Sequence, residues 1–129
     1  TVRARRVQSF FRAAVLSGYN FRCALTGLAI PNLLNASHII PWSESVERRA
    51  DPRNGICLNA LHDRAFDRGL IAIDDDYRVI VSPLVSKAKG DTYAAQVLGS
   101  VEGTKLMPPE RFEPDRSALA WHRRHIFRN

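Results

Sequence analysis

The spacing of apolar residues predicts a helix near each end of the chain. Over residues 3–19 the apolar positions recur at the interval that places them on one side of a helix, with arginines on the other side. Residues 115–127 show a similar repeat, with Leu119, Trp121 and Ile126–Phe127 as the expected buried contacts. The chain is therefore expected to begin and end with a helix.

Between these helices, short apolar runs alternate with turn-forming residues. Residues 33–40 predict a short strand, and residues 56–66 predict a strand or turn that leads into a helix. The alternation over residues 70–82 predicts a β-hairpin that turns at Asp75–Asp76. One or two short helices are expected within residues 83–98. This mixture of helices and strands indicates an α+β fold.

Length and composition indicate one small globular domain. We expect residues 1–129 to share one modest core, because 45% hydrophobic and 25% charged side chains are ordinary for a soluble protein. The absence of an initial Met favours a piece cut from a longer protein. No apolar run approaches the ~20 residues that span a bilayer, and no secretion signal precedes the first helix. We therefore expect a cytoplasmic protein without a membrane partner.

Charge and cysteine content narrow the function further. The net charge is +6, and arginine supplies all but three of the basic side chains. Arginine can bind phosphate through two parallel hydrogen bonds, so this bias favours a nucleic-acid partner. Cys23 and Cys57 are too few for a disulfide framework, and the paired ligand spacing of a structural zinc site is missing. Both are expected to be reduced core residues.

Four polar residues have the chemistry that phosphodiester hydrolysis needs. His38 follows the first predicted strand, Asn54 ends the polar loop 42–53, and His62 and Asp63 fall in the first turns of the next helix. The reaction requires a base that activates water and a cation that neutralises the phosphate. A neutral His38 can be the base, and His62 and Asp63 are candidate metal ligands. The Asn54 amide can bond backbone groups across the loop and so orient His38.

The order of these residues resembles the HNH endonuclease family, in particular its restriction endonuclease branch. The resemblance is carried by Cys23–Gly27, Ala36–Trp42, Asn54–Ile56 and His62–Leu70, with Gln8, Phe11–Arg12, Trp121–Arg123 and Phe127–Arg128 outside them. A lone set of His, Asn and His would be a weak signal, but four linked segments in this order are specific.

The resemblance implies a ββα-metal core, also called a His-Me finger, within residues 23–82. In such a core two short antiparallel strands, a loop and a helix surround one divalent cation, here flanked by the end helices and a β-hairpin. His38 then matches the general base and Asn54 the middle asparagine, and the third catalytic position falls at His62 or Asp63. Both stay candidate metal ligands. A carboxylate suits Mg²⁺ or Mn²⁺, which favours Asp63, with Ni²⁺ and Zn²⁺ as alternatives.

Ser37 departs from the family pattern. Many HNH proteins place an acidic or histidine ligand just before the base histidine, and a serine hydroxyl is a poor ligand. Asp67, water or a DNA phosphate could complete the metal shell. Asp67 is, however, also placed to pair locally with Arg64 or Arg68.

The expected function is a metal-dependent HNH endonuclease that hydrolyses phosphodiester bonds of DNA, expected to be double-stranded. The basic residues nearest the motif are the expected phosphate contacts: Arg48, Arg49, Arg53 and Arg64. The alternatives are a catalytically weak or silent HNH-fold DNA-binding module, and an accessory domain that a partner protein targets. Cutting both strands with one active site would call for a homodimer, and a larger parent protein is the other assembly considered.

Overall fold

A computed structural model of the protein describes residues 1–88 and 90–129. Its helices are α1 (Val2–Gly18), α2 (Ala60–Asp67), α3 (Pro83–Ser86), α4 (Thr92–Val97) and α5 (Arg116–His125). Its strands are β1 (Leu34–His38), β2 (Gly55–Asn59), β3 (Ile71–Ile73) and β4 (Val79–Val81). The predicted end helices, the first strand, the strand that leads into a helix and the later hairpin are therefore confirmed.

Both sheets are antiparallel pairs of strands, and the chain has the mixed α/β composition that the sequence predicts. In the first sheet, β1 and β2 pair in a register that sets Leu34 opposite Asn59 and His38 opposite Gly55. Helix α2 follows β2 directly, and the Asn59 side chain caps it by accepting a hydrogen bond from the His62 amide. His38 and the start of α2 therefore lie at opposite ends of the hairpin.

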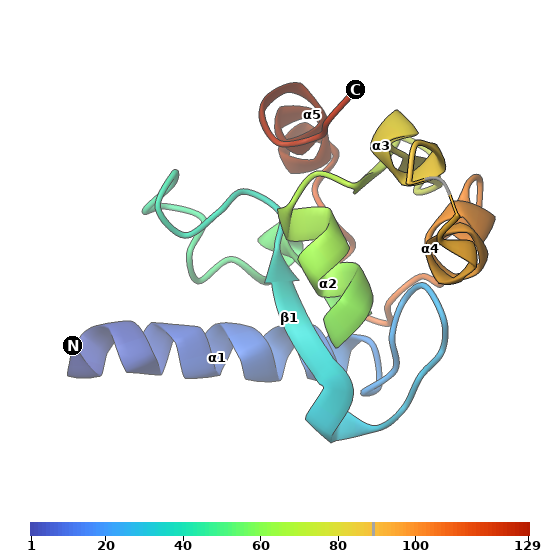
Figure 1. The fold of residues 1–129 in the computed structure, drawn as a ribbon. Coiled ribbons are helices and arrows are strands. Elements are labelled where there is room, and N and C mark those ends of the chain that lie inside the picture. Colours follow the sequence, from blue (N-terminus) through green and yellow to red (C-terminus); the bar gives the residue numbers. More distant parts are fainter. Residues whose placement is uncertain (89) are drawn as a thin grey trace.

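Helix α1 packs against this hairpin, while its N-terminal end extends beyond the rest of the chain (Figure 1). A Cβ atom on Gly55 would lie 2.5 Å from Cγ2 of Val15 and 2.7 Å from Cζ of Phe11, so only glycine fits between helix and strand. The Asn54–Gly55 pair ends the loop as predicted. Gly55 itself has an extended φ of −137°, and the glycine is needed for space rather than for a turn.

Helix α5 buries Leu119 as predicted, and it also buries His122. Ala118, Leu119 and His122 are buried, whereas Trp121 is only half-buried and stacks on His125 at 4.3 Å. Trp121 packs against the core from this half-buried position, so the predicted contact is present although the side chain is not fully buried. The His122 ring lies inside because it stacks on Phe66 at 3.7 Å, and its Nε2 donates a hydrogen bond of 2.9 Å to the Phe66 carbonyl.

The core combines buried side chains of α1, both sheets, α2 and α5. Cys23 and Cys57 are buried and free, as predicted for reduced core residues. None of the helices in residues 1–88 and 90–129 has the length and apolar character needed to cross a membrane.

Candidate active site

A pocket of about 520 Å³ opens between α1, β1 and α2, and it brings together groups that the sequence places far apart. His38 comes from the end of β1, and Asp63 and Asp67 come from successive turns of α2. The other polar or aromatic lining residues are Gln8, Phe11, Arg12, Asn35, Trp42 and His122. The pocket therefore contains one imidazole at β1 and two carboxylates across from it on α2.

The His38 ring is held from three sides. It stacks on Phe11 at 3.7 Å with an interplanar angle of 8°, and Trp42 meets it edge-on at 6.1 Å. Its Nε2 lies 3.1 Å from the carbonyl oxygen of Arg49, and a carbonyl can only accept, so Nε2 carries the proton. Nδ1 is then the free acceptor. Burial lowers the pKa of His38, although the Arg49 carbonyl and the Asp63 charge both act to raise it. The lowered pKa favours a neutral imidazole near pH 7.

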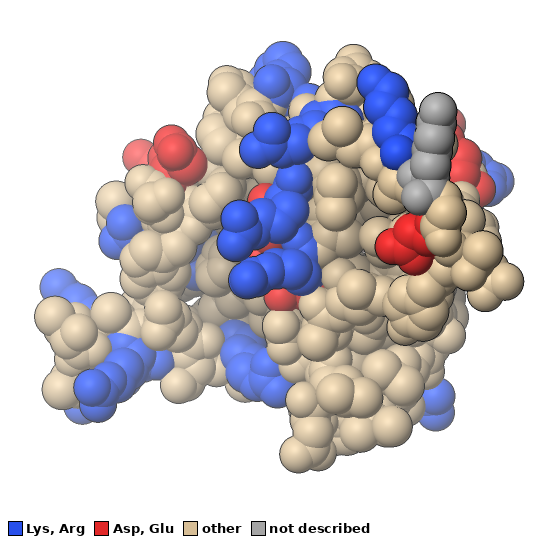
Figure 2. Space-filling model, in the orientation of Figure 1, with Lys and Arg blue, Asp and Glu red and all other residues tan. Residues whose placement is uncertain are grey.

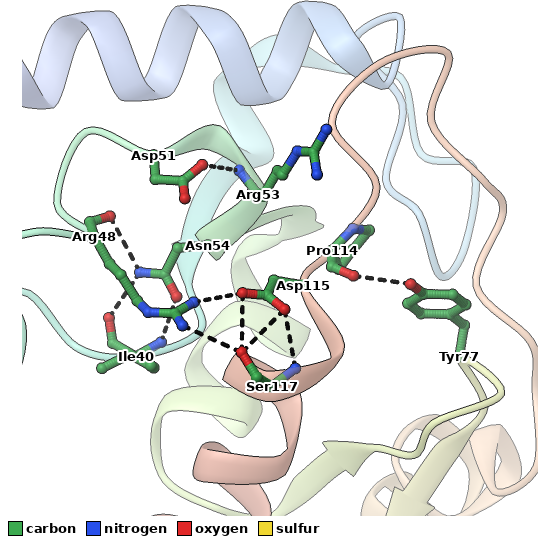
Figure 3. Close-up of polar contacts among 9 residues, drawn as sticks. All are labelled: Ile40, Arg48, Asp51, Arg53, Asn54, Tyr77, Pro114, Asp115 and Ser117. Carbon is green, nitrogen blue, oxygen red and sulfur yellow. Dashed lines mark hydrogen bonds and ion pairs between the residues drawn. The ribbon is translucent and has the colours of Figure 1, made fainter.

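Asn54 fixes the loop that supplies this carbonyl (Figure 3). Its Oδ1 accepts from the Ile40 amide at 2.9 Å, and its Nδ2 donates to the Ile40 carbonyl at 3.0 Å and to the Arg48 carbonyl at 3.4 Å. Asn54 thus ties the start of the loop to the residue before Arg49. Because Asn54 is 1% exposed, these bonds do not compete with water. The bonds join backbone groups across the loop, which is the geometry that the sequence predicts for this amide.

The two carboxylates of the pocket have different environments. Asp63 accepts a hydrogen bond of 2.8 Å from Asn35 Nδ2 across the pocket floor. Asp67 is largely exposed, yet partial burial of its carboxyl and the neighbouring Asp63 charge raise its pKa to about 6, and Arg64 and Arg68 offset this only in part. Among the residues that the structure describes, no ion pair joins Asp67 to either arginine. Asp67 therefore belongs to the pocket rather than to a local pair.

His62 does not reach the pocket. It is 4% exposed, and its Nδ1 lies 2.9 Å from the side-chain amide nitrogen of Asn59, the residue that caps α2. Burial lowers the pKa of its ring. Of the two candidate ligands at this point of the motif, the structure brings only Asp63 next to His38. The catalytic and ligand roles of His62 stay predictions that its position does not support.

Ser37 faces the core as well. It is 1% exposed, pairs with Ile56 in the sheet, and does not line the pocket. The place that an acidic ligand often takes before the base histidine is thus turned away from the site. Asn35, two residues earlier on β1, and Asp67 on α2 line the pocket instead.

Of the four predicted phosphate-binding arginines, two contact other residues of the chain and two are exposed. Arg48 forms an ion pair of 2.7 Å with Asp115 (Figure 3), and Arg49 donates to the Trp42 carbonyl and lies 4.6 Å above the Trp42 ring. Arg53 and Arg64 are exposed. Basic side chains gather over the face that carries α2, with acidic atoms between them (Figure 2). Arg53 and Arg64 are therefore the better placed of the four for a polyanion.

Sequence reasoning missed Arg12 and Asn35. Arg12 lines the pocket from α1 and is anchored by a hydrogen bond of 2.9 Å from its Nη1 to the Leu34 carbonyl. The sequence pattern only places it among the arginines on the polar side of the first helix. The signal that could have identified it is its place directly after Phe11, within a segment that already carried the family resemblance. Asn35 gave no such signal, because its role depends on contact with Asp63.

The donor set of the pocket suits a hard divalent cation. Carboxylate oxygens of Asp63 and Asp67 are the ligands that Mg²⁺ and Mn²⁺ prefer. Burial, and after it the Asp63 charge, raises the pKa of Asp67, and a bound cation would offset both effects. Within residues 1–88 and 90–129, no three His, Cys, Asp or Glu side chains converge on one point. The pocket thus fits a cation held by two carboxylates, with its other positions left for water or a phosphate.

Comparisons with known proteins bear on the family and on the fold. Residues 23–74 match the family described as HNH endonuclease, a segment that contains His38, Asn54 and Asp63. The fold is similar to a solved structure titled "Modification dependent TagI restriction endonuclease", with a TM-score of 0.56 and 18% sequence identity. The similarity covers 90% of this chain and 37% of that one, so the chain spans just over a third of the neighbour's length. Curated proteins gave no match.

Proposed function

We propose that this chain is a metal-dependent endonuclease that hydrolyses phosphodiester bonds of DNA, with His38 as the general base, because residues 23–74 match the HNH endonuclease family. One observation carries the proposal. The His38 ring lines a pocket shared with Asp63 and Asp67, and its Nε2 proton is committed to the Arg49 carbonyl. Nδ1 is thereby the nitrogen that accepts a proton from water.

The surroundings of His38 suit this task. A lowered pKa keeps the ring unprotonated near neutral pH, and the Arg49 carbonyl stabilises the imidazolium that forms when water is deprotonated. Phe11 and Trp42 limit ring rotation, so Nδ1 keeps one direction. Asn54 acts one step further out, as a positioning residue that holds the loop carrying Arg49.

Asp63 and Asp67 would hold the divalent ion, with Mg²⁺ or Mn²⁺ as the expected metal. A bound cation there would neutralise the scissile phosphate and the departing oxygen. Asn35 orients Asp63 through their hydrogen bond. Arg12 is the one cationic side chain among the described pocket-lining residues, and we assign it to a non-bridging phosphate oxygen.

The proposed substrate is double-stranded DNA. The net charge of +6 and the basic side chains around α2 favour a polyanion, with Arg53 and Arg64 exposed for backbone contacts. The similar solved structure is described as modification-dependent, so modified DNA is the second substrate to test. In a longer parent protein, other parts would choose the sequence or the modification.

Plasmid cleavage tests the proposal. Supercoiled plasmid, unmodified or carrying modified bases, is incubated with Mg²⁺ or Mn²⁺ and wild type, His38→Ala or His125→Ala. The last variant is the control, since His125 is an exposed histidine outside the pocket. Loss of the base should slow nicking about 10²–10⁴-fold, with DNA affinity and folding nearly unchanged. His125→Ala should cut normally.

Two results would count against the proposal. Full activity of His38→Ala would remove His38 from the mechanism. A folded wild type that binds DNA in a salt-sensitive manner and cuts none of these substrates would favour the silent DNA-binding module instead. That alternative has one observation behind it, since within the described residues the pocket offers only two carboxylates and no three-ligand cluster.

A further inference from the structure

Four polar side chains meet where the turn before β1 contacts the start of α2, outside the active-site pocket. The side-chain amide nitrogen of Asn59, Nδ2, lies 3.4 Å from Sγ of Cys23, 3.5 Å from Oγ1 of Thr26 and 2.9 Å from Nδ1 of His62. The backbone amide of Asn59 also donates to Sγ of Cys23, at 3.3 Å. Cys23, Asn59 and His62 are each at most 9% exposed. None of the four lines the pocket that contains His38.

The spacing of these residues is that of a metal site. Cys23 and Thr26 are separated by two residues in a turn, and Asn59 and His62 are separated by two residues at a strand-to-helix junction. Two such pairs, brought together in space, are how small domains hold a structural zinc ion tetrahedrally. Structural zinc sites are built from thiolate and imidazole ligands, however, and of these four residues only Cys23 and His62 supply them. The described residues accordingly contain no cluster of three metal-binding side chains.

We propose that Cys23, Thr26, Asn59 and His62 form a metal-free clasp with the layout of a tetrahedral zinc site, in which hydrogen bonds of Asn59 replace the ion. The clasp joins the turn at residues 23–27 to the first turn of α2. It is a positioning device, because the residue after His62 is Asp63, whose side chain lines the pocket. The clasp also accounts for the buried position of His62.

The test is to restore the two missing ligands. Thr26→Cys/Asn59→Cys would surround the centre with three thiols and the His62 imidazole. This variant should bind about one Zn²⁺ per chain. With Co²⁺ it should show the intense visible absorption and thiolate charge-transfer bands of tetrahedral coordination. Zinc should raise its Tm and a chelator should lower it. Wild type should show neither response, and neither should Ser9→Cys/Thr104→Cys, which adds two thiols at exposed positions elsewhere.

The clasp is refuted if Co²⁺ gives no tetrahedral thiolate spectrum in a folded double variant, or if wild type itself binds zinc in this place. A double variant that is unfolded without metal and folds on adding zinc supports it. If the double variant does not fold under either condition, Asn59→Asp decides. Aspartate keeps the acceptor that caps α2 but loses the donor to Cys23 and Thr26, so Tm should fall by several degrees, and an unchanged Tm would overturn the clasp. These readouts do not use DNA cleavage, so they are independent of the nuclease proposal.

Discussion

Gly55→Ala is a direct test of how α1 supports the active site. The added methyl would lie 2.5 Å from Cγ2 of Val15 and 2.7 Å from Cζ of Phe11, so the helix or the strand must move. Overpacking of this kind costs about 1–3 kcal/mol. The extended φ of −137° imposes no strain of its own, and removing a glycine from the unfolded chain stabilises by about 0.4–1 kcal/mol. We expect a net loss of about 1–2 kcal/mol.

Urea and thermal unfolding, followed by circular dichroism, measure this loss. Tm should fall by roughly 3–10 °C. Gly99→Ala is the matched control, because a Cβ atom there meets nothing within 4 Å, and its stability should stay the same or rise by up to about 1 kcal/mol. Adding Val15→Ala to Gly55→Ala removes the nearer of the two clashes. The double variant should therefore lose less stability than the sum of the single losses.

The same substitution should also impair catalysis, because Phe11 stacks on the His38 ring at 3.7 Å. A displaced Phe11 leaves His38 free to rotate, and small errors in the direction of a base lower the rate strongly. Cleavage measured well below Tm should fall by more than the folded fraction does. A Gly55→Ala protein with the stability and activity of wild type would refute the packing described between α1 and the hairpin.

Two further predictions concern other residues of the pocket. Burial lowers the pKa of His122 from 6.5 to about 4. Between these two pH values the unfolded chain binds a proton at this histidine that the folded chain does not. The free energy of unfolding should therefore fall on acidification by up to ~1.4 kcal/mol per pH unit. His122→Gln should flatten this slope in urea unfolding at pH 7 and pH 5, and an unchanged slope would contradict the assignment. Arg12→Gln should lower kcat about 10²-fold with little change in DNA affinity. Arg6→Gln, on the same helix but outside the pocket, is the control and should leave kcat and affinity unchanged. Equal losses in the two variants would show that only net charge matters.

The elements of the fold were predictable because each depends on local pattern. The apolar repeat of α1, the alternation of the β3–β4 hairpin and the acidic turn between its strands are all contained in short stretches of sequence. The loop-fixing geometry of Asn54 could be expected as well, since an amide that ends a loop has backbone groups of the same loop within reach.

Other features depend on contacts between distant parts of the chain, which no local pattern reveals. Arg48 is occupied by Asp115, 67 residues later, so a residue that looked free for phosphate is paired. His122 is more deeply buried than Trp121 because its ring stacks on Phe66 of α2 and bonds the Phe66 carbonyl. Asp67 lies one turn after Asp63 and so on the same side of α2. This side faces a pocket only because α1 and β1, which are distant in sequence, pack opposite it.

The choice between His62 and Asp63 follows from helix geometry together with the clasp. Neighbouring residues on a helix point ~100° apart, so both cannot enter one pocket. His62 contacts the Asn59 amide, which in turn contacts Cys23 and Thr26, and this fixes the rotation of the first turn of α2. Asp63 is then directed toward Asn35 and the pocket. The direction of Asp63 therefore depends on hydrogen bonds made on another side of the helix, and if Asp63 binds the metal as proposed, loosening them should weaken metal binding without changing a ligand.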